Sequence, residues 1–203
     1  MYQALNATSK TLRDYLRTQI LADTFLNAPT SPWNMRSMVV TLNTPTEMVD
    51  NSQEGLSLWL YRVVRDPERL NDPPRRVSAV TMRPPPLPLR LHYLITPITS
   101  RDNAGDPETE QYVLGKVLQL LHSKSTLSGA DLRDEFVGSD VELRIRLETL
   151  NVDEITRLWD ALEGSYQLCV SYEVSLVNID SALEPETFTP VEVVLPEFGL
   201  ITS

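Results

Sequence analysis

Four stretches in which apolar and polar residues alternate constrain this chain most strongly, because a period of two is the pattern of a β-strand with one face in a core. They cover residues 56–64, 89–95, 141–147 and 168–176. In 89–95 the apolar residues at 89, 91, 93 and 95 share one face, and Arg90, His92 and Leu94 lie on the other. In 141–147 every second residue is charged, which predicts an antiparallel sheet with one solvated face. A further strand is predicted at 38–42.

Three other segments show the apolar stripe of an amphipathic helix. They are residues 2–25, 107–122 and 151–162, and a short helical turn is predicted at 131–136. Asn151 and Glu154 have the spacing of a capping box at the start of the third helix, and Gly164 is expected to end it in the left-handed conformation. The stripe of this helix that we expect to be buried contains Ile155, Leu158, Trp159 and Leu162.

The order of these segments predicts an α+β fold, with a small, mainly antiparallel sheet flanked by about three helices. With 203 residues the chain has room for one such domain, which we assign to residues 1–178. Inside it, residues 65–88 are expected to form a proline-rich connector without regular structure. Residues 65–69 and 72–76 are predicted to be turn-like, and residues 83–88 extended and close to polyproline II. Residues 179–203 contain three prolines and no basic residue, and we predict that they form an extended acidic C-terminal arm.

Composition argues against several classes of protein. No apolar run reaches the roughly 18 residues of a transmembrane helix, and the N-terminus lacks the pattern of a secretory signal, so we expect a cytoplasmic protein without direct membrane insertion. The single cysteine, Cys169, cannot form an internal disulfide, and its apolar neighbours in the sequence indicate an inert thiol. A net charge of −10 argues against a protein that binds nucleic acid through phosphate contacts.

Charge is distributed unevenly along the chain. Residues 1–101 carry a net charge of +4 and residues 102–203 a net charge of −14, and fifteen of the eighteen basic residues are arginine. One interpretation is a solvated surface with accidental asymmetry. The other is a molecule with a basic side and an acidic side, which suits lateral or head-to-tail assembly through arginine–carboxylate contacts.

No motif in the sequence carries catalytic chemistry. His92 and His122 have no cysteine or carboxylate at ligand spacing, and the outward position of His92 on its predicted strand does not suggest a ligand. The glycines are isolated, so there is no phosphate-binding loop, and the adjacent carboxylates Asp153 and Glu154 fit the first turn of a helix. We therefore predict no catalytic residue, no cofactor and no metal ligand. An enzyme with an unrecognised site remains the less favoured alternative.

Three stretches together resemble a known family. They are residues 89–96, 110–121 and 154–174, and the N-terminal helix and residues 56–61 extend the resemblance over most of 1–178. The order and spacing of these stretches, together with the series Trp159, Tyr166 and Tyr172, resemble those of a family of cap, or tail-terminator, proteins. This family belongs to extracellular contractile injection systems of the antifeeding-prophage and Photorhabdus virulence cassette type.

The resemblance implies a structural role. Members of this family are thought to form a six-fold ring at the distal end of the inner tube and its contractile sheath, where the ring ends tube growth and anchors the last sheath layer. The implied fold is that of phage tail terminators, and the implied partners are further copies of the chain, sheath protein and inner-tube protein. The implied place of assembly is the cytoplasm, as part of a phage-tail-like particle. Another adaptor or connector ring of such a particle is the alternative.

Two groups of residues are candidate interfaces. The first lies in the predicted arm, whose β-prone runs suit addition of a strand to a neighbouring sheet; the alternative is that the arm packs as an edge strand on its own sheet. Its candidate residues are Val191, Val193, Leu195, Phe198 and Leu200. The second group is a basic loop that we expect to contact an acidic surface of a neighbour. Its residues are Arg65, Arg69, Arg75, Arg76 and Arg83.

Overall fold

The computed structural model describes residues 2–78, 80–99 and 105–187, which form two sheets and five α-helices. The helices are α1 (Ala4–Leu21), α2 (Pro32–Met35), α3 (Pro45–Asp50), α4 (Pro107–Ser123) and α5 (Val152–Ala161). The strands are β1 (Val39–Thr41), β2 (Gly55–Arg65), β3 (Arg75–Arg76), β4 (Thr81–Arg83), β5 (Leu87–Ile98), β6 (Thr126–Ser128), β7 (Glu142–Glu148), β8 (Val170–Ile179) and β9 (Glu186–Thr187). Short 3-10 helices lie at Pro67–Arg69, Gly129–Asp131 and Asp134–Phe136.

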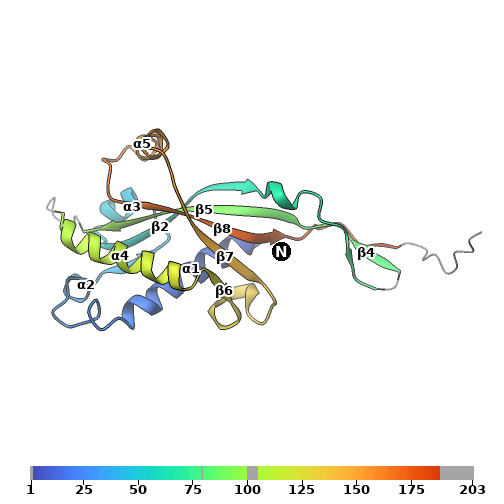
Figure 1. Ribbon diagram of the computed structural model, residues 1–203, viewed down its shortest axis with the longest axis horizontal. Coiled ribbons are helices and arrows are strands. Elements are labelled where there is room, and N and C mark those ends of the chain that lie inside the picture. Colours follow the sequence, from blue (N-terminus) through green and yellow to red (C-terminus); the bar gives the residue numbers. More distant parts are fainter. Residues whose placement is uncertain (1, 79, 100–104, 188–203) are drawn as a thin grey trace, which may run out of the picture.

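The larger sheet has six strands in the order β1-β2-β5-β8-β7-β6. All neighbouring pairs are antiparallel except β1 and β2, which are parallel. The long strands β2, β5 and β8 pair with one another over most of their length. One extra residue at Tyr61 forms a bulge in the pairing of β2 with β5. Helices α1 and α4 cover one face of this curled sheet, and α5 stands on the opposite face (Figure 1). The predicted α+β class, with a mainly antiparallel sheet, is confirmed.

The main core lies between this sheet and helices α1 and α4. The predicted alternation in β5 is confirmed, because Leu89, Leu91, Tyr93 and Ile95 all point into this core. Helix α1 approaches the sheet closely through small residues, and the hydroxyl of its Ser9 lies 2.7 Å from the buried hydroxyl of Tyr93. The main-core residues of the two helices are Ala4, Ala7, Leu12, Tyr15, Leu16, Ile20, Val113, Val117 and Leu121.

The opposite face of the sheet is covered only in part. Met48, Leu94, Ile98 and Trp159 are buried there outside the main core, and they bring α3 and α5 onto this face. The stripe predicted on α5 is confirmed in position but is buried less deeply than expected, since Trp159 is buried, Ile155 and Leu158 are half-buried, and the other residues of the helix are exposed.

The segment predicted to be a proline-rich connector contains two of the three strands of the second sheet. Strands β3 and β4 form a hairpin, and β9 pairs with the other edge of β4, in the order β3-β4-β9. The prediction that regular structure is absent from 65–88 is therefore wrong, because residues 75–83 are free of proline and Arg75 and Arg76 pair with Arg83 and Met82. The hairpin projects from one end of the molecule, away from the helices (Figure 1).

Local capping explains where the helices begin and end. The capping box of Asn151 and Glu154 is present as predicted, and α3, which we did not predict, begins with an equivalent box formed by Thr44 and Glu47. The left-handed residue after α5 is Glu163, with φ of 52°, and not Gly164 as predicted. Within the described ranges, no helix has the length and apolarity that a membrane span requires.

Candidate functional site

The hairpin concentrates three of the five predicted interface arginines. Arg75 and Arg76 make up β3, and Arg83 ends β4. Arg75 lies directly opposite Arg83 in the antiparallel register. Both side chains are exposed, and neither has an ion-pair partner among residues 2–78, 80–99 and 105–187. Like charges placed directly opposite each other destabilise a strand pair, so this local arrangement is unfavourable in the isolated chain.

Arg65 and Arg69 lie at the base of the hairpin and not on it. Arg69 donates to the side-chain oxygen of Asn178 at 3.0 Å and forms an ion pair with Asp72 at 2.6 Å. Arg65 is exposed at the end of β2. Both border a hollow of about 310 Å³ at the junction between the hairpin and the large sheet. The five arginines of the predicted basic loop therefore divide into a projecting group and a base group.

The candidate arm residues Val191, Val193, Leu195, Phe198 and Leu200 lie outside the described residues. The described part of the predicted arm ends in β9, which pairs with β4 of the same chain through Thr187 opposite Thr81 and Glu186 opposite Met82. The start of the arm thus forms an edge strand on the chain's own small sheet, and an intersubunit role for residues 188–203 stays a prediction.

A polar cluster lies on the second face of the large sheet, where sequence analysis expected only outward-facing residues. Its centre is Glu148, whose carboxylate lies 2.9 Å from Nδ1 of His92 and accepts a hydrogen bond of 2.8 Å from the Ser171 hydroxyl. The Tyr61 hydroxyl lies 3.0 Å from that of Ser171. Burial alone raises the pKa of Glu148, but hydrogen bonds from His92, Ser171 and Tyr61 and the charge of His92 outweigh it, so the net pKa is lowered.

Glu173 extends this cluster toward the base of the hairpin. It lies opposite His92 in the register and pairs with Arg146 at 3.2 Å and Arg90 at 3.6 Å. Arg90 also contacts Asp66 at 2.7 Å. The ligand atoms of His92, Glu148 and Glu173 all lie within 4.8 Å of one another, a spacing compatible with a metal ion. Two arginines already balance Glu173, however, so the arrangement is that of an ion-pair network joining β5, β7 and β8.

Sequence reasoning missed this cluster for a physical reason. His92 is 5% exposed and buried, not outward-facing in solvent as the strand pattern suggested. Its neighbours Glu148 and Glu173 come from other strands, 56 and 81 positions further along the chain. The three residues come together only through the pairing register of β5, β7 and β8. The spacing of residues within any one segment does not indicate this register.

Cys169 behaves as predicted from its apolar neighbours. It is half-buried directly before β8, and burial raises the pKa of its thiol, although the nearby Trp159 side chain partly opposes this shift. A raised pKa reduces the thiolate fraction at neutral pH and with it the reactivity of the group.

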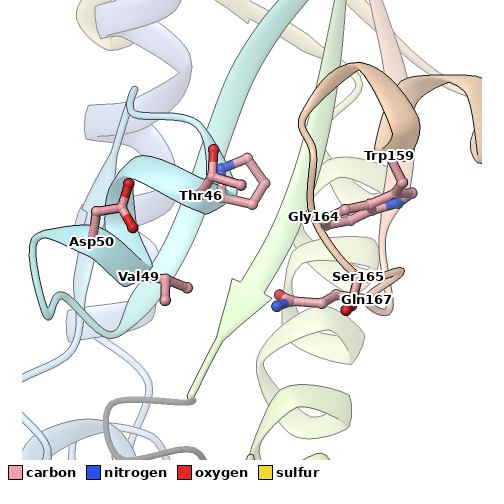
Figure 2. A pocket seen from close by; sticks show the side chains of 8 residues that line it. Thr46, Val49, Asp50, Trp159, Gly164, Ser165 and Gln167 are labelled. Carbon is pink, nitrogen blue, oxygen red and sulfur yellow. The ribbon is translucent and has the colours of Figure 1, made fainter.

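An open cavity of about 190 Å³ separates α3 from the loop that follows α5. Figure 2 shows Thr46, Val49 and Asp50 on the α3 side and Trp159, Gly164 and Gln167 on the other, with the Gln167 amide pointing into the gap. The side-chain oxygen of Gln167 is buried and has no hydrogen-bond partner within the described part of the chain. The cavity thus offers an apolar floor, an unpaired acceptor and an acidic rim.

The described residues form a curled six-stranded sheet, a projecting basic hairpin and several open hollows. The chain belongs to the Pvc16 N-terminal domain family, whose model matches residues 7–192. The family resemblance inferred from the sequence is thereby confirmed. The comparison with curated protein sequences finds no match.

Two solved structures are similar to the chain. One is the tube-terminating cap of the anti-feeding prophage, with a TM-score of 0.60 and 21% sequence identity over 98% of this chain and 61% of that chain. The other is the PVC sheath/tube terminator of an extracellular contractile injection system in its extended state, with a TM-score of 0.49 and 19% identity over 76% of this chain and 54% of that chain. The first supports the predicted tail-terminator-like fold. The chain spans about 61% of the length of the cap that it matches.

Proposed function

We propose that this chain is a structural cap, or tail terminator, of a contractile injection system. It forms a ring at the distal end of the inner tube and sheath, ends tube growth and anchors the last sheath layer. Its partners are further copies of itself, in a homo-hexameric ring, together with sheath and inner-tube proteins. Assembly takes place in the cytoplasm as part of a phage-tail-like particle, and the protein makes and breaks no covalent bond.

The observation that carries this proposal is the match of fold over 98% of the chain to a cap that terminates a tube. Membership of the Pvc16 N-terminal domain family supports the same role. The physical logic is simple: a growing tube ends in an unsatisfied interface, and a ring that fits this interface on one side and offers no equivalent surface on the other stops growth.

The polar groups of the described residues support a contact role over catalysis. The carboxylates of the buried cluster, Glu148 and Glu173, are paired with His92, Arg90 and Arg146. The only described thiol, that of Cys169, has a raised pKa. His92, which pairs with Glu148, is 5% exposed, as expected for an ion-pair network inside a fold.

Particle length provides the test. Cells that make the injection system but lack this gene are expected to produce tubes of broad length distribution, and reintroducing the wild-type gene is expected to restore one length. Tube lengths are measured on negatively stained particles. A narrow, unchanged distribution in the deletion strain would contradict the proposal.

Truncation separates the two parts of the predicted arm. Removal of residues 188–203 leaves β9 in place, whereas removal of 180–203 also deletes β9. We expect both truncated chains to fold, because β9 is exposed and contributes nothing to the main core. If the arm crosses to a neighbour, both are expected to be missing from particles, as measured by immunoblot of purified particles. A truncated chain that still caps particles normally rules out the arm hypothesis.

A further inference from the structure

The surface of the hairpin suggests that it is completed by something outside the chain. The segment 73–86 carries three arginines and no acidic residue. Its strands contain no buried residue, and Val77 and Val80 near the turn are 55% and 41% exposed. A small sheet without a core has little stability of its own. The like-charged pair of Arg75 and Arg83 adds a local penalty that a partner's carboxylates would remove.

The opposite half of the molecule carries a surface of complementary charge. Helices α3 and α5 with the turns around them contain six carboxylates and only one basic residue, Arg157. Asp50 borders the cavity of Figure 2, and Glu163 directly precedes Gly164, which also lines it. Neither carboxylate has an ion-pair partner in the described ranges. The carboxylates are Glu47, Asp50, Asp153, Glu154, Asp160 and Glu163.

The cavity between these helices matches the hairpin in chemistry as well as in charge. Its volume of about 190 Å³ corresponds to roughly six water molecules, enough for one branched aliphatic side chain such as Val77 or Val80. The unpartnered oxygen of Gln167 is an acceptor for a guanidinium group. An apolar centre with a charged rim is the usual anatomy of a protein–protein interface.

The two surfaces lie in opposite halves of the long axis (Figure 1). A contact between different surfaces of identical chains is heterologous, and it closes into a ring when the rotation per subunit allows. We infer that the hairpin of one copy docks into the cavity between α3 and α5 of the next copy, with Arg75 and Arg83 facing Asp50 and Glu163. This inference rests on the proposed ring and identifies the two faces that build it.

Charge exchange tests the contact without tube or sheath. In the hairpin variant, Arg75→Glu is combined with Arg83→Glu; in the cavity variant, Asp50→Arg is combined with Glu163→Arg. Each variant alone places like charges across the contact, and we expect the concentration for half-assembly to rise by about tenfold or more. An equimolar mixture restores both complementary contacts in alternation and is expected to assemble like the wild type.

Matched controls carry equal charge changes elsewhere on the exposed surface. Arg17→Glu with Arg144→Glu, and Asp140→Arg with Glu142→Arg, change residues that are exposed and lie outside both faces. These controls are expected to assemble like the wild type. Mass is measured by sedimentation velocity, and circular dichroism confirms that each variant is folded.

A disulfide trap gives a second readout on the same contact. In a Cys169→Ala background, Val77→Cys combined with Val49→Cys is expected to link copies into a ladder under mild oxidation, whereas either single cysteine stops at a dimer. A mixture that stays monomeric, single charge variants that assemble like the wild type, or the absence of a ladder overturns the inference. Because these measurements use the purified chain alone, the particle-length test of the proposed function is independent of them.

Discussion

The six-stranded body and the hairpin sheet of the same chain differ in how they are stabilised. In the body, β5 has eleven of its twelve residues buried or half-buried, and two helices close one face. In the hairpin sheet, every described residue of the strands is exposed or half-buried, and arginines face each other across the register. Burial therefore stabilises the body, whereas the strands of the hairpin sheet have no buried residue to stabilise them.

This difference makes the hairpin a candidate contact surface. A sequence that specifies a fold has local preferences that agree with the whole structure, and departures from that agreement concentrate at functional sites. The body shows such agreement in its alternating strands. The hairpin departs from it, because its valines are exposed and two of its arginines lie opposite each other.

The largest effect is expected in the centre of the body. Leu91 is fully buried on the main-core face of β5, so Leu91→Ala leaves a cavity and is expected to lower the free energy of unfolding by about 2–5 kcal/mol. Leu87, on the same strand but 44% exposed, provides the control, and Leu87→Ala is expected to cost less than about 0.5 kcal/mol. Urea denaturation measures both. Equal losses of unfolding free energy in the two variants would contradict the view that burial stabilises the centre of β5 more than its end near the hairpin.

The second effect concerns the edge of the body. Gly55 has φ of +137°, and an added Cβ would lie 1.9 Å from the carbonyl oxygen of Val39. Gly55→Ala is expected to lower the free energy of unfolding by about 2–3 kcal/mol, because β1 is an edge strand that can partly detach. Gly115 on α4 has open space around its Cβ position, and Gly115→Ala is expected to stabilise by about 0.5–1 kcal/mol. A neutral Gly55→Ala variant would show that the parallel pairing of β1 is dispensable.

Much of the body could be predicted from the sequence, because its elements are long and periodic. Strand β5 and helix α4 were found within about three residues at each end, which is normal for boundaries. The missed elements are short: α3 has six residues, and its Thr44 cap and Pro45 also fit the loop that ends the predicted strand at 38–42. Strands β3 and β4 have two and three residues, too few for alternation to be visible among prolines.

The candidate surfaces were predictable only where one segment carries them. The three hairpin arginines are close in sequence, so charge counting found them. The cavity between α3 and α5 joins residues 45–50 with residues 159–167, and the cluster around Glu148 joins three strands. Such sites depend on tertiary register, which no local pattern encodes.

A smaller, pH-dependent effect is expected on the second face of the body. Because the pKa of Glu148 is lowered in the folded chain, its stabilising contribution is present above the unfolded pKa and is lost as pH falls through the folded one. The difference in unfolding free energy between wild type and Glu148→Gln is therefore expected to shrink between about pH 7 and about pH 3. Glu142→Gln, an exposed change on the same strand, is the control. A difference that stays constant with pH would exclude a charged role for Glu148.

The smallest effect on stability is expected in the hairpin. Arg75→Ala removes one of two opposed charges and is expected to change the free energy of unfolding by less than about 0.5 kcal/mol, in the stabilising direction. The same change is expected to weaken self-association, as measured by sedimentation velocity. Arg75→Ala would thus affect assembly and not stability, whereas Leu91→Ala affects stability. A clear loss of stability would show that Arg75 supports the fold of the isolated chain.

The position of the chain on the particle tests the central claim most directly. A gold-labelled tag placed after residue 203 can be located on intact particles by electron microscopy. The account predicts label at the end of the tube and sheath that lies away from the baseplate, and at that end alone. Label along the sheath, at the baseplate, or only on free protein would contradict it.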